Sequence, residues 1–568
     1  MLEVKETKAQ RIERLKREKN TWEHLDQIRE FARLGHESIP LEWLTTYFRP
    51  WGIYTQGDGQ GVVGGTGGEG KAVSYFMVRI RVPNGLLTSE QARTIASLSS
   101  EHGNGVADLT VRQNIQLHWV RIQSIPEVLD RLRSVGLSTT GACGDVTRNI
   151  TGCPLAGVDS REVANVSPLA LALDKELAGN PEFYNLPRKF KISVTGCPDW
   201  CSYPEINDIG LTATRRMRQG GEEIGFSVRV AGGLSTQPHL AVRLNAFVQW
   251  HQVIPVVRAI TELFRGSEML RQSREKARLK FLFLEHGWTA ESFLAAVEAR
   301  LGYSLDAAEP EDLPSHVHRD HLGVTPQKQP GLFSVGANVI RGRVTPAQLC
   351  VAADLAERYG DGHVRATPMQ NLLLINIGGL NVPTVIAELS AAGLPVVTSS
   401  FARGTVACTG SEFCKLALTE TKSFARWLTE QLEERFPNYQ EDLRLHITGC
   451  PNSCGQHWIA DIGIEGKKIK VNGKMVDAYY FCVGGSVGQI ASIARPVGYR
   501  CPADEVPEAI TRLLAAFHAD RHVGEALQQF LARHSNETLR AILAGGFVEF
   551  AERDLPVAGI PHSVEERA

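Results

Sequence analysis

An internal repeat spans most of this 568-residue chain and constrains its fold more than any other feature. Three motifs recur in the same order, two of them at an offset of 257 residues and the third at 253, a drift that one loop insertion would produce. A repeat of this length is far longer than a solenoid unit. It predicts two homologous halves packed about a pseudo-twofold axis, with a ligand site between them. The matched segments are 76–79 with 333–336, 109–114 with 366–371, and 195–201 with 448–454.

Each half has the same local pattern, a strand followed by a helix and a second strand. Runs of β-branched and aromatic residues closed by turn residues indicate the strands, and a Thr followed by apolar residues at helical spacing indicates the helices. Sheets covered by helices in both halves predict the α+β class. The expected strands are 73–82, 109–120, 332–340 and 372–377, the expected helices are 88–101, 289–301, 345–358 and 505–519, and the expected connection between the halves is 310–329.

Composition and net charge indicate the class of protein and its cellular compartment. A content of 43% hydrophobic and 22% charged residues is typical of a water-soluble globular protein. The formal net charge of −2 gives no reason to expect a nucleic-acid partner, and no apolar run is long enough to span a bilayer. Eleven cysteines, an odd number, fit a reducing cytoplasm better than a disulfide framework. With no apolar run of a secretory signal at the start, we expect a cytoplasmic protein.

Two cysteine pairs near the C-terminus predict a metal centre. Cys408 and Cys414 lie in A-C-T-G-S-E-F-C, and Cys450 and Cys454 lie in T-G-C-P-N-S-C-G. Four thiolates suit zinc or an iron–sulfur cluster, and ligand type alone does not choose between them. Structural zinc sites typically place about two to four residues between paired ligands, whereas the gaps here are five and three. Four unrelated core cysteines would have no reason to recur as pairs in Gly-rich turns.

The two copies of the repeat differ in charge, and such a difference points to the site. Arg79 stands where the second copy has Gly336, and Arg112 stands where it has Met369. One half is therefore expected to supply cations and the other a soft metal centre. The further basic residues of the first copy are Arg148 in D-V-T-R-N, and Arg188, Lys189 and Lys191 in L-P-R-K-F-K.

Lys189 and Lys191 are the most informative of these cations. Residues two apart in a strand face the same side. Two like charges side by side are unfavourable unless an anion lies between them. The pair therefore predicts an anion site.

These motifs resemble those of the sirohaem- and 4Fe-4S-dependent sulfite and nitrite reductases of the ferredoxin-dependent assimilatory type. The resemblance runs in the family's order from about residue 50 to 550, over 110–116, 145–149, 186–191, 408–414 and 449–454. It implies that each half combines a ferredoxin-like half-domain with a sirohaem reductase domain. The implied divisions are an N-terminal helical extension at 1–50, half-domain 1 at 51–139, reductase domain 1 at 140–308, a linker with half-domain 2 at 309–398, and reductase domain 2 at 399–568.

The resemblance also implies a role for each candidate residue. Cys454 would ligate the sirohaem iron as well as the cluster, so that one sulfur couples the two centres. The implied cluster ligands are Cys408, Cys414, Cys450 and Cys454. The residues implied to line the distal face, where the substrate anion binds, are Arg79, Arg148, Lys189 and Lys191. Those implied to meet the carboxylates of the macrocycle, which need cationic partners when buried, are Arg112 and Arg188.

The activity implied is a six-electron reduction of sulfite to sulfide or of nitrite to ammonia, in a monomer. No G-x-G-x-x-G opens a helix after a strand, so electrons are expected from ferredoxin or a similar small carrier. Lys191 fits the sulfite-type K-x-K pattern, whereas the segments 148–157 and 321–329 look closer to the nitrite branch. We expect sulfite as the main substrate. The alternatives are nitrite as the main substrate, a cobalamin-pathway monooxygenase, and a non-catalytic zinc scaffold.

Two features of the first half depart from the cluster pattern. Cys197 and Cys201 repeat the second cluster pair, but nine residues separate Cys143 from Cys153 where the cluster motif has five. We expect a relic of duplication that binds no cluster, with a second metal site as the alternative. Some relatives place a Tyr and a Cys together beside the sirohaem, and the resemblance implies that Tyr54 approaches Cys143.

Overall fold

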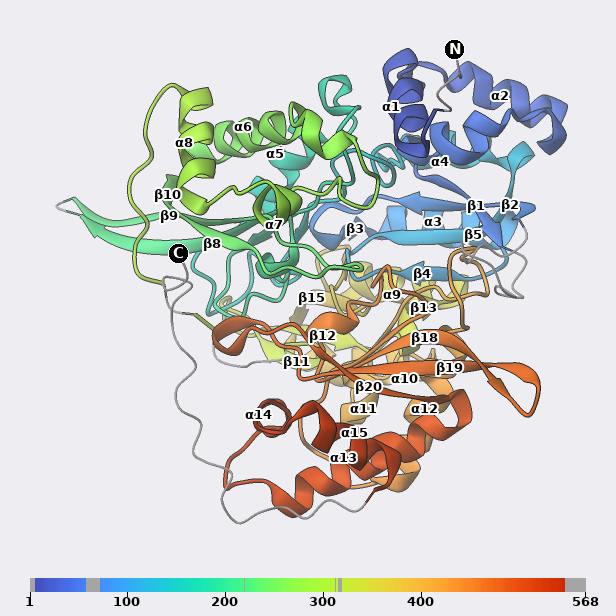
Figure 1. Ribbon diagram of the computed structural model, residues 1–568, viewed down its shortest axis with the longest axis vertical. Coiled ribbons are helices and arrows are strands. Elements are labelled where there is room, and N and C mark those ends of the chain that lie inside the picture. The colour runs from blue at the N-terminus through green and yellow to red at the C-terminus, as the bar shows by residue number, and fades with distance from the viewer. Residues whose placement is uncertain (1–5, 58–71, 219, 312, 315–318, 547–568) are drawn as a thin grey trace.

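The computed structural model describes residues 6–57, 72–218, 220–311, 313–314 and 319–546, and it confirms the expected α+β class. In Figure 1 the first half of the chain, in blue to green, lies above the second half, in yellow to red. The described residues form four five-stranded sheets that occur as two matched pairs.

Two of the sheets exchange a strand with each other. The first has the order β1 (Ile53–Gly57), β2 (Ala72–Ile80), β5 (Ile115–Arg121), β4 (Ala107–Leu109), β13 (Arg343–Val344). The second has the order β11 (Gly323–Pro326), β12 (Leu332–Ala337), β15 (Leu372–Gly378), β14 (His363–Ala366), β3 (Leu86–Thr88). β13 therefore crosses into the first-half sheet and β3 into the second-half sheet. This reciprocal exchange is what a pseudo-twofold axis between two homologous halves produces, and it confirms the prediction from the repeat.

The other two sheets have the same strand order as each other. The first-half sheet has the order β10 (Val242–Gln249), β9 (Gly221–Val230), β8 (Ile209–Arg218), β7 (Ile192–Thr195), β6 (Thr151–Gly152). The second-half sheet has the order β20 (Arg495–Pro502), β19 (Lys474–Val483), β18 (Ile462–Val471), β17 (Leu445–Thr448), β16 (Thr405–Ala407). In both, two short strands run parallel to the first strand of a long antiparallel hairpin.

Helices cover these sheets and begin where the sequence predicts. The side chains of Thr88 and Thr345 cap α3 and α9 by accepting from the N–H groups of Gln91 and Gln348, at 3.1 and 3.2 Å. The first-half helices are α1 (Lys8–Glu18), α2 (Leu25–Leu34), α3 (Ser89–Glu101), α4 (Ile125–Ser134), α5 (Ser167–Leu177), α6 (Val253–Arg265), α7 (Phe281–Glu285) and α8 (Ala290–Leu301). The second-half helices are α9 (Pro346–Tyr359), α10 (Val382–Ala391), α11 (Ser400–Gly404), α12 (Lys422–Arg435), α13 (Val506–Asp520), α14 (Leu527–Arg533) and α15 (Asn536–Ala544).

The strand expected over 109–120 is wrong as a single element. The structure divides it into β4 and β5 around a turn over 110–114. The Thr110 hydroxyl accepts from the N–H of Asn114 at 3.1 Å, and Gln113 adopts φ +60°. This local side-chain to backbone bonding competes with the sheet ladder. The turn is what presents Arg112.

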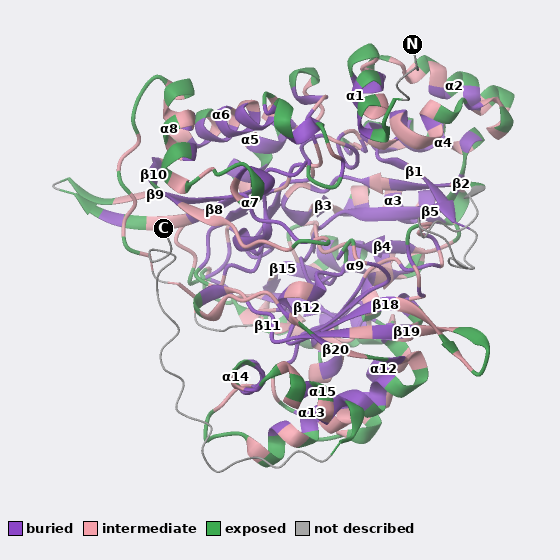
Figure 2. Ribbon diagram, in the orientation of Figure 1, coloured by how far each residue is buried: buried purple, intermediate pink, exposed green. Residues whose placement is uncertain are grey.

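The core is divided as the architecture requires. One buried apolar cluster runs through both strand-exchanged sheets, from Leu15 to Val396. A second cluster covers the other first-half sheet and includes Leu373 and Ile375 of β15, and a third covers the other second-half sheet. Figure 2 shows buried residues along the central sheets and exposed residues on the outer helices. The two halves therefore meet through a shared core.

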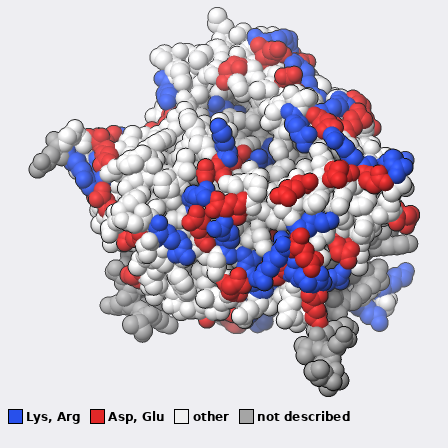
Figure 3. Space-filling model, turned by 90° about the horizontal axis from the view of Figure 1, so that it is seen from above, with Lys and Arg blue, Asp and Glu red and all other residues white. Residues whose placement is uncertain are grey.

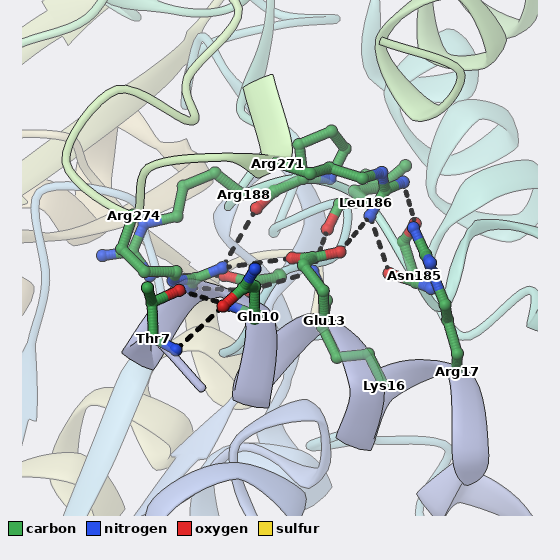
Figure 4. Close-up of polar contacts among 12 residues, drawn as sticks. Thr7, Gln10, Glu13, Lys16, Arg17, Asn185, Leu186, Arg188, Arg271 and Arg274 are labelled. Atoms are coloured by element: carbon green, nitrogen blue, oxygen red, sulfur yellow. Dashed lines mark hydrogen bonds and ion pairs between the residues drawn. The ribbon is translucent and has the colours of Figure 1, made fainter. Parts of the chain in front are cut away.

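The N-terminal helix α1 is fastened to the segment that carries the basic motif (Figure 4). The Lys16 ammonium donates to the carbonyl of Leu186 at 2.8 Å and lies 3.4 Å from the Asp145 carboxylate. Glu13 of the same helix pairs with Arg271 at 2.6 Å. Asp145 also pairs with Arg188 at 3.4 Å and Arg274 at 2.7 Å. These buried contacts hold residues 186–188 in place just before Lys189.

On the face seen in Figure 3, acidic and basic side chains are interspersed. This agrees with a formal net charge of −2. None of the helices in the described residues combines the length and the apolar character needed to cross a bilayer.

Candidate functional site

The four predicted cluster cysteines gather at one edge of the second-half sheet. β16 and β17 run parallel and pair through Ala407 and Ile447, so their carboxyl ends meet at that edge. Cys408 follows β16, Cys450 follows β17, and the N–H of Cys408 donates to the carbonyl of Ile447 at 3.1 Å. The sheet therefore brings the two cysteine motifs together.

The thiols of Cys408, Cys414, Cys450 and Cys454 affect one another. Each of the four lies within electrostatic range of the other three. Burial, followed by the nearby Cys454, raises the pKa of Cys408 and of Cys450, and raises the pKa of Cys414 to about 12. Crowded, buried thiolates are unfavourable until cations balance them. Iron ions of a cluster would supply that charge.

Main-chain N–H groups in the loops around three of these thiols favour the thiolate form that binds metal. In each, the main-chain N–H two residues later acts on the sulfur and favours the thiolate, and the Cys408 sulfur also accepts a hydrogen bond from the N–H of Gly449 at 3.2 Å. The pairs are Cys408 with Gly410, Cys414 with Leu416, and Cys450 with Asn452.

Cys454 differs from the other three in being exposed. Its electrostatic neighbours include Arg79 and Lys189, which come from the first half of the chain. An accessible sulfur beside cations of the opposite half fits a ligand shared between a cluster and a second metal group. Half-buried cations beside it suit a macrocycle that carries carboxylates. The residues present therefore fit both a 4Fe-4S cluster and a sirohaem.

Lys189 and Lys191 lie just before β7. Burial, Arg188 and Arg278 lower the pKa of Lys189 to about 7. Burial, Arg278 and Arg112 also lower the pKa of Lys191. Among the described residues, neither ammonium forms a hydrogen bond or an ion pair, although the Asp208 carboxylate lies within electrostatic range of Lys191. The two lysines are therefore crowded by positive charge and available to an anion.

The sequence analysis missed two cations of this site, Arg278 and Lys280. Arg278 pairs with Asp208 through contacts of 2.7 and 3.2 Å. Lys280 donates to the carbonyl of Leu234 at 2.9 Å, and burial, together with Arg278, lowers its pKa to about 7. The run K-A-R-L-K (276–280) carries the same two-apart basic pattern as Lys189 and Lys191, and that signal could have identified it.

Among the predicted arginines of the first half, Arg79 and Arg148 lie within electrostatic range of Arg112. Burial, followed by Arg148, lowers the pKa of Arg112 to about 9. Its guanidinium donates to Asn207 at 2.7 Å, and its Nε has no partner among the described residues. Arg148 donates to the carbonyl of Gly144 at 2.9 Å. Arg188 is the outlying member, because it already pairs with Asp145.

Arg79 of β2 links this group to the predicted Tyr–Cys pair. Its Nη1 donates to the Cys143 sulfur at 3.0 Å. Burial acts to lower the pKa of Arg79, but the neighbouring Cys143 and Tyr54 outweigh burial and raise it. Tyr54 and Cys143 thus share Arg79 as a neighbour, and their direct approach stays a prediction.

The second half cannot build the same cation site, for a steric reason. A Cβ on Gly336, the counterpart of Arg79, would lie 1.8 Å from the carbonyl oxygen of His321. The connection between the halves therefore occupies this space. Met369, the counterpart of Arg112, is buried in an apolar cluster with Tyr203.

Comparison with known proteins agrees with this geometry. The family model described as "Nitrite and sulphite reductase 4Fe-4S domain" matches residues 143–305 and 398–545, and "Nitrite/Sulfite reductase ferredoxin-like half domain" matches 69–135 and 325–392.

Curated relatives carry both substrate names. The assimilatory ferredoxin-dependent nitrite reductase of Haloferax mediterranei is 38% identical over 537 residues, covering 89% of this chain and 88% of that protein. A sulfite reductase [ferredoxin] of Mycolicibacterium paratuberculosis is 37% identical over 522 residues, covering 90% and 92%.

A solved structure has the same fold. The Mycobacterium tuberculosis NirA protein superposes with a TM-score of 0.86 at 35% identity, covering 93% of this chain and 97% of that one. The chain therefore belongs to the nitrite and sulfite reductase family of oxidoreductases, with a ferredoxin-like half-domain and a 4Fe-4S-type reductase domain in each half.

Proposed function

We propose that this chain catalyses the ferredoxin-dependent six-electron reduction of sulfite to sulfide, at a sirohaem joined through Cys454 to a 4Fe-4S cluster. The observation that carries the proposal is the position of Lys189, a lysine with no partner among the described residues, within electrostatic range of the exposed Cys454. Lys191 beside it completes the K-x-K pair that favours sulfite.

The cofactors, when bound, supply the electrons and an open iron position that no amino acid can provide. The side chains of the chain hold the anion and move protons. Arg79 and Arg148 stay charged at any working pH, so they attract and orient the oxyanion. A cation about 4 Å from an oxyanion contributes roughly 4 kcal/mol at an effective dielectric near 20.

Lys189 and Lys191 are the proposed proton donors. A general acid works best when its pKa lies near the operating pH. Lys189, with a pKa of about 7, meets that condition, whereas an arginine keeps its proton at neutral pH. Arg112 and Arg188 are proposed to pair with carboxylates of the macrocycle.

Nitrite reduction to ammonia is the second candidate. It is favoured by relatives named for that activity, among them the ferredoxin–nitrite reductase of Synechococcus elongatus, 38% identical over 521 residues and covering 89% of this chain and 96% of that protein. The same names support ferredoxin as the electron donor. The proposed domain divisions assign the cations to 51–308 and the thiols to 399–568.

Steady-state turnover with reduced ferredoxin tests the proposal. Sulfide and ammonia are measured with each anion as sole substrate, and kcat/KM is compared. We expect a higher kcat/KM for sulfite. A large preference for nitrite would reverse the assignment, and a purified protein without haem absorption bands would remove it.

A further inference from the structure

A second group of potential metal ligands lies in the first half, away from the four cluster thiols. The ligand atoms of Cys153, Cys201 and His321 lie within 4.8 Å of one another, and so do those of Cys153, Asp159 and Cys197. Cys153, Cys197, Cys201 and His321 are each between 1% and 5% exposed. Cys153 belongs to both groups, and the three thiols lie within electrostatic range of one another.

The loop after Cys197 resembles the loops after the cluster cysteines in the position of one main-chain N–H group. The main-chain N–H of Asp199, two residues later, acts on the Cys197 sulfur and favours the thiolate. The main-chain N–H of Asn452 acts in the same way on Cys450, the counterpart of Cys197 253 residues later. Three residues separate Cys197 from Cys201, a spacing within the usual range for paired zinc ligands.

His321 points into this group with nothing else to bind. Neither of its ring nitrogens has a hydrogen-bond partner among the described residues, although the side chain is buried. Its backbone adopts φ +63°, an uncommon conformation for a residue with a side chain, and packs against Gly336. A buried imidazole without partners is costly, and a metal ion would provide the missing partner.

Asp159 is the less suitable fourth ligand. Its carboxylate already accepts from Arg319 and from the N–H of Arg161. Arg319 also lies within electrostatic range of Cys153 and Cys201. Three thiolates and one dication leave a net negative charge, and this arginine is placed to offset it.

The spacing of Cys153, Cys201 and His321 favours a single ion over a cluster, and Cys197 lies within 4.8 Å of Cys153. Zinc–sulfur bonds of about 2.3 Å place two sulfurs of a tetrahedral site roughly 3.8 Å apart. A cubane keeps its cysteine sulfurs farther apart, because its irons and sulfides lie between them. Among the described residues, no group of three ligand atoms within 4.8 Å includes any of the four cluster thiols.

We propose that Cys153, Cys197, Cys201 and His321 bind one structural zinc ion. Three thiolates and one imidazole are an established donor set for structural zinc. Binding displaces the thiol protons to solvent, and no electron is transferred. The ion would link reductase domain 1, which carries the three cysteines, to the connection between the halves, which carries His321. His321 packs against Gly336, the second-half counterpart of Arg79.

Metal analysis of the native holoenzyme tests the proposal directly. The protein is treated briefly with EDTA, dialysed, and assayed for zinc and iron by mass spectrometry. We expect about one zinc ion per chain, with sulfur at about 2.3 Å and nitrogen at about 2.0 Å in zinc-edge X-ray absorption. Zinc below about a tenth of an ion per chain, even after incubation with Zn²⁺, overturns the proposal. An oxygen-dominated shell also overturns it, because that marks an adventitious surface ion.

Variants locate the ion. The double variant Cys197→Ser, Cys201→Ser should lower zinc at least about tenfold while iron per chain stays constant. The matched control is Cys350→Ser, which replaces a half-buried cysteine of α9 and should leave the zinc content unchanged. If the double variant fails to fold, His321→Ala decides the matter. It should release zinc to a chelator about 10- to 100-fold faster than the native protein, and an unchanged rate with an unchanged absorption shell contradicts the assignment.

Discussion

Lys191 and Arg444 occupy equivalent positions in the two halves, and the main-chain N–H of each donates at 2.8 Å to an aspartate 17 residues later. In the second half, the Arg444 side chain also forms an ion pair with that aspartate, Asp461, at 3.0 Å. In the first half, the equivalent aspartate, Asp208, forms its ion pair with Arg278 and not with Lys191. This exchange of partners leaves the Lys191 ammonium available to an anion.

Replacing Lys189 by arginine should change the pH profile. Lys189, with a pKa of about 7, is protonated below neutral pH and loses its proton above it, so kcat/KM should fall about tenfold per pH unit on the alkaline side. A bound anion favours the protonated form, so the fall in kcat should come at higher pH. Lys189→Arg keeps the charge but cannot donate, and kcat should drop roughly 10²- to 10⁴-fold. The control is Lys276→Arg at an exposed position, and an alkaline limb that persists in Lys189→Arg contradicts the assignment.

Replacing Lys191 by asparagine should alter the balance between substrates. The change removes a cation beside the proposed anion site while keeping a polar side chain. The KM for sulfite should rise about tenfold or more, since each tenfold corresponds to about 1.4 kcal/mol. The ratio of kcat/KM for nitrite to that for sulfite should increase. Equal losses for both anions would show that Lys191 does not discriminate between them.

Replacing Cys454 by serine should separate the two proposed centres. The exposed thiol is the proposed shared ligand, and serine is a poor ligand for soft metal sites. The haem absorption bands and turnover should be lost. Cys482→Ser, at a buried cysteine of β19, is the control and should keep both. A Cys454→Ser variant that retains haem and turnover removes the shared-ligand proposal.

Replacing Asp461 by asparagine should destabilise the second half. Arg444 and Asp461 are 2% and 3% exposed, and removing one partner of a buried ion pair typically costs about 3–5 kcal/mol. The free energy of unfolding is measured by denaturant titration of the holoenzyme. Asp130→Asn breaks the exposed pair with Arg29 and should cost about 0–1 kcal/mol. A similar small loss in both variants contradicts a structural role for the buried pair.

The sequence alone determined the duplicated architecture, the helix starts at Thr88 and Thr345, and the two cysteine motifs, because these depend on local patterns that recur at a fixed offset. The sequence predicted a continuous strand over 109–120 and so missed the turn that carries Arg112. The hydrogen bonds of Thr110 and the buried contacts of Gln113 override strand propensity there.

Only the tertiary structure decided which residues meet. Arg278 joins Asp208, and His321 joins Cys153, from segments far apart in the chain. No periodicity encodes such contacts, since they arise where the sheets and the connection between the halves pack together. The positive charge around Lys189 is likewise a sum over side chains from several elements, and only their arrangement in space brings its pKa to about 7.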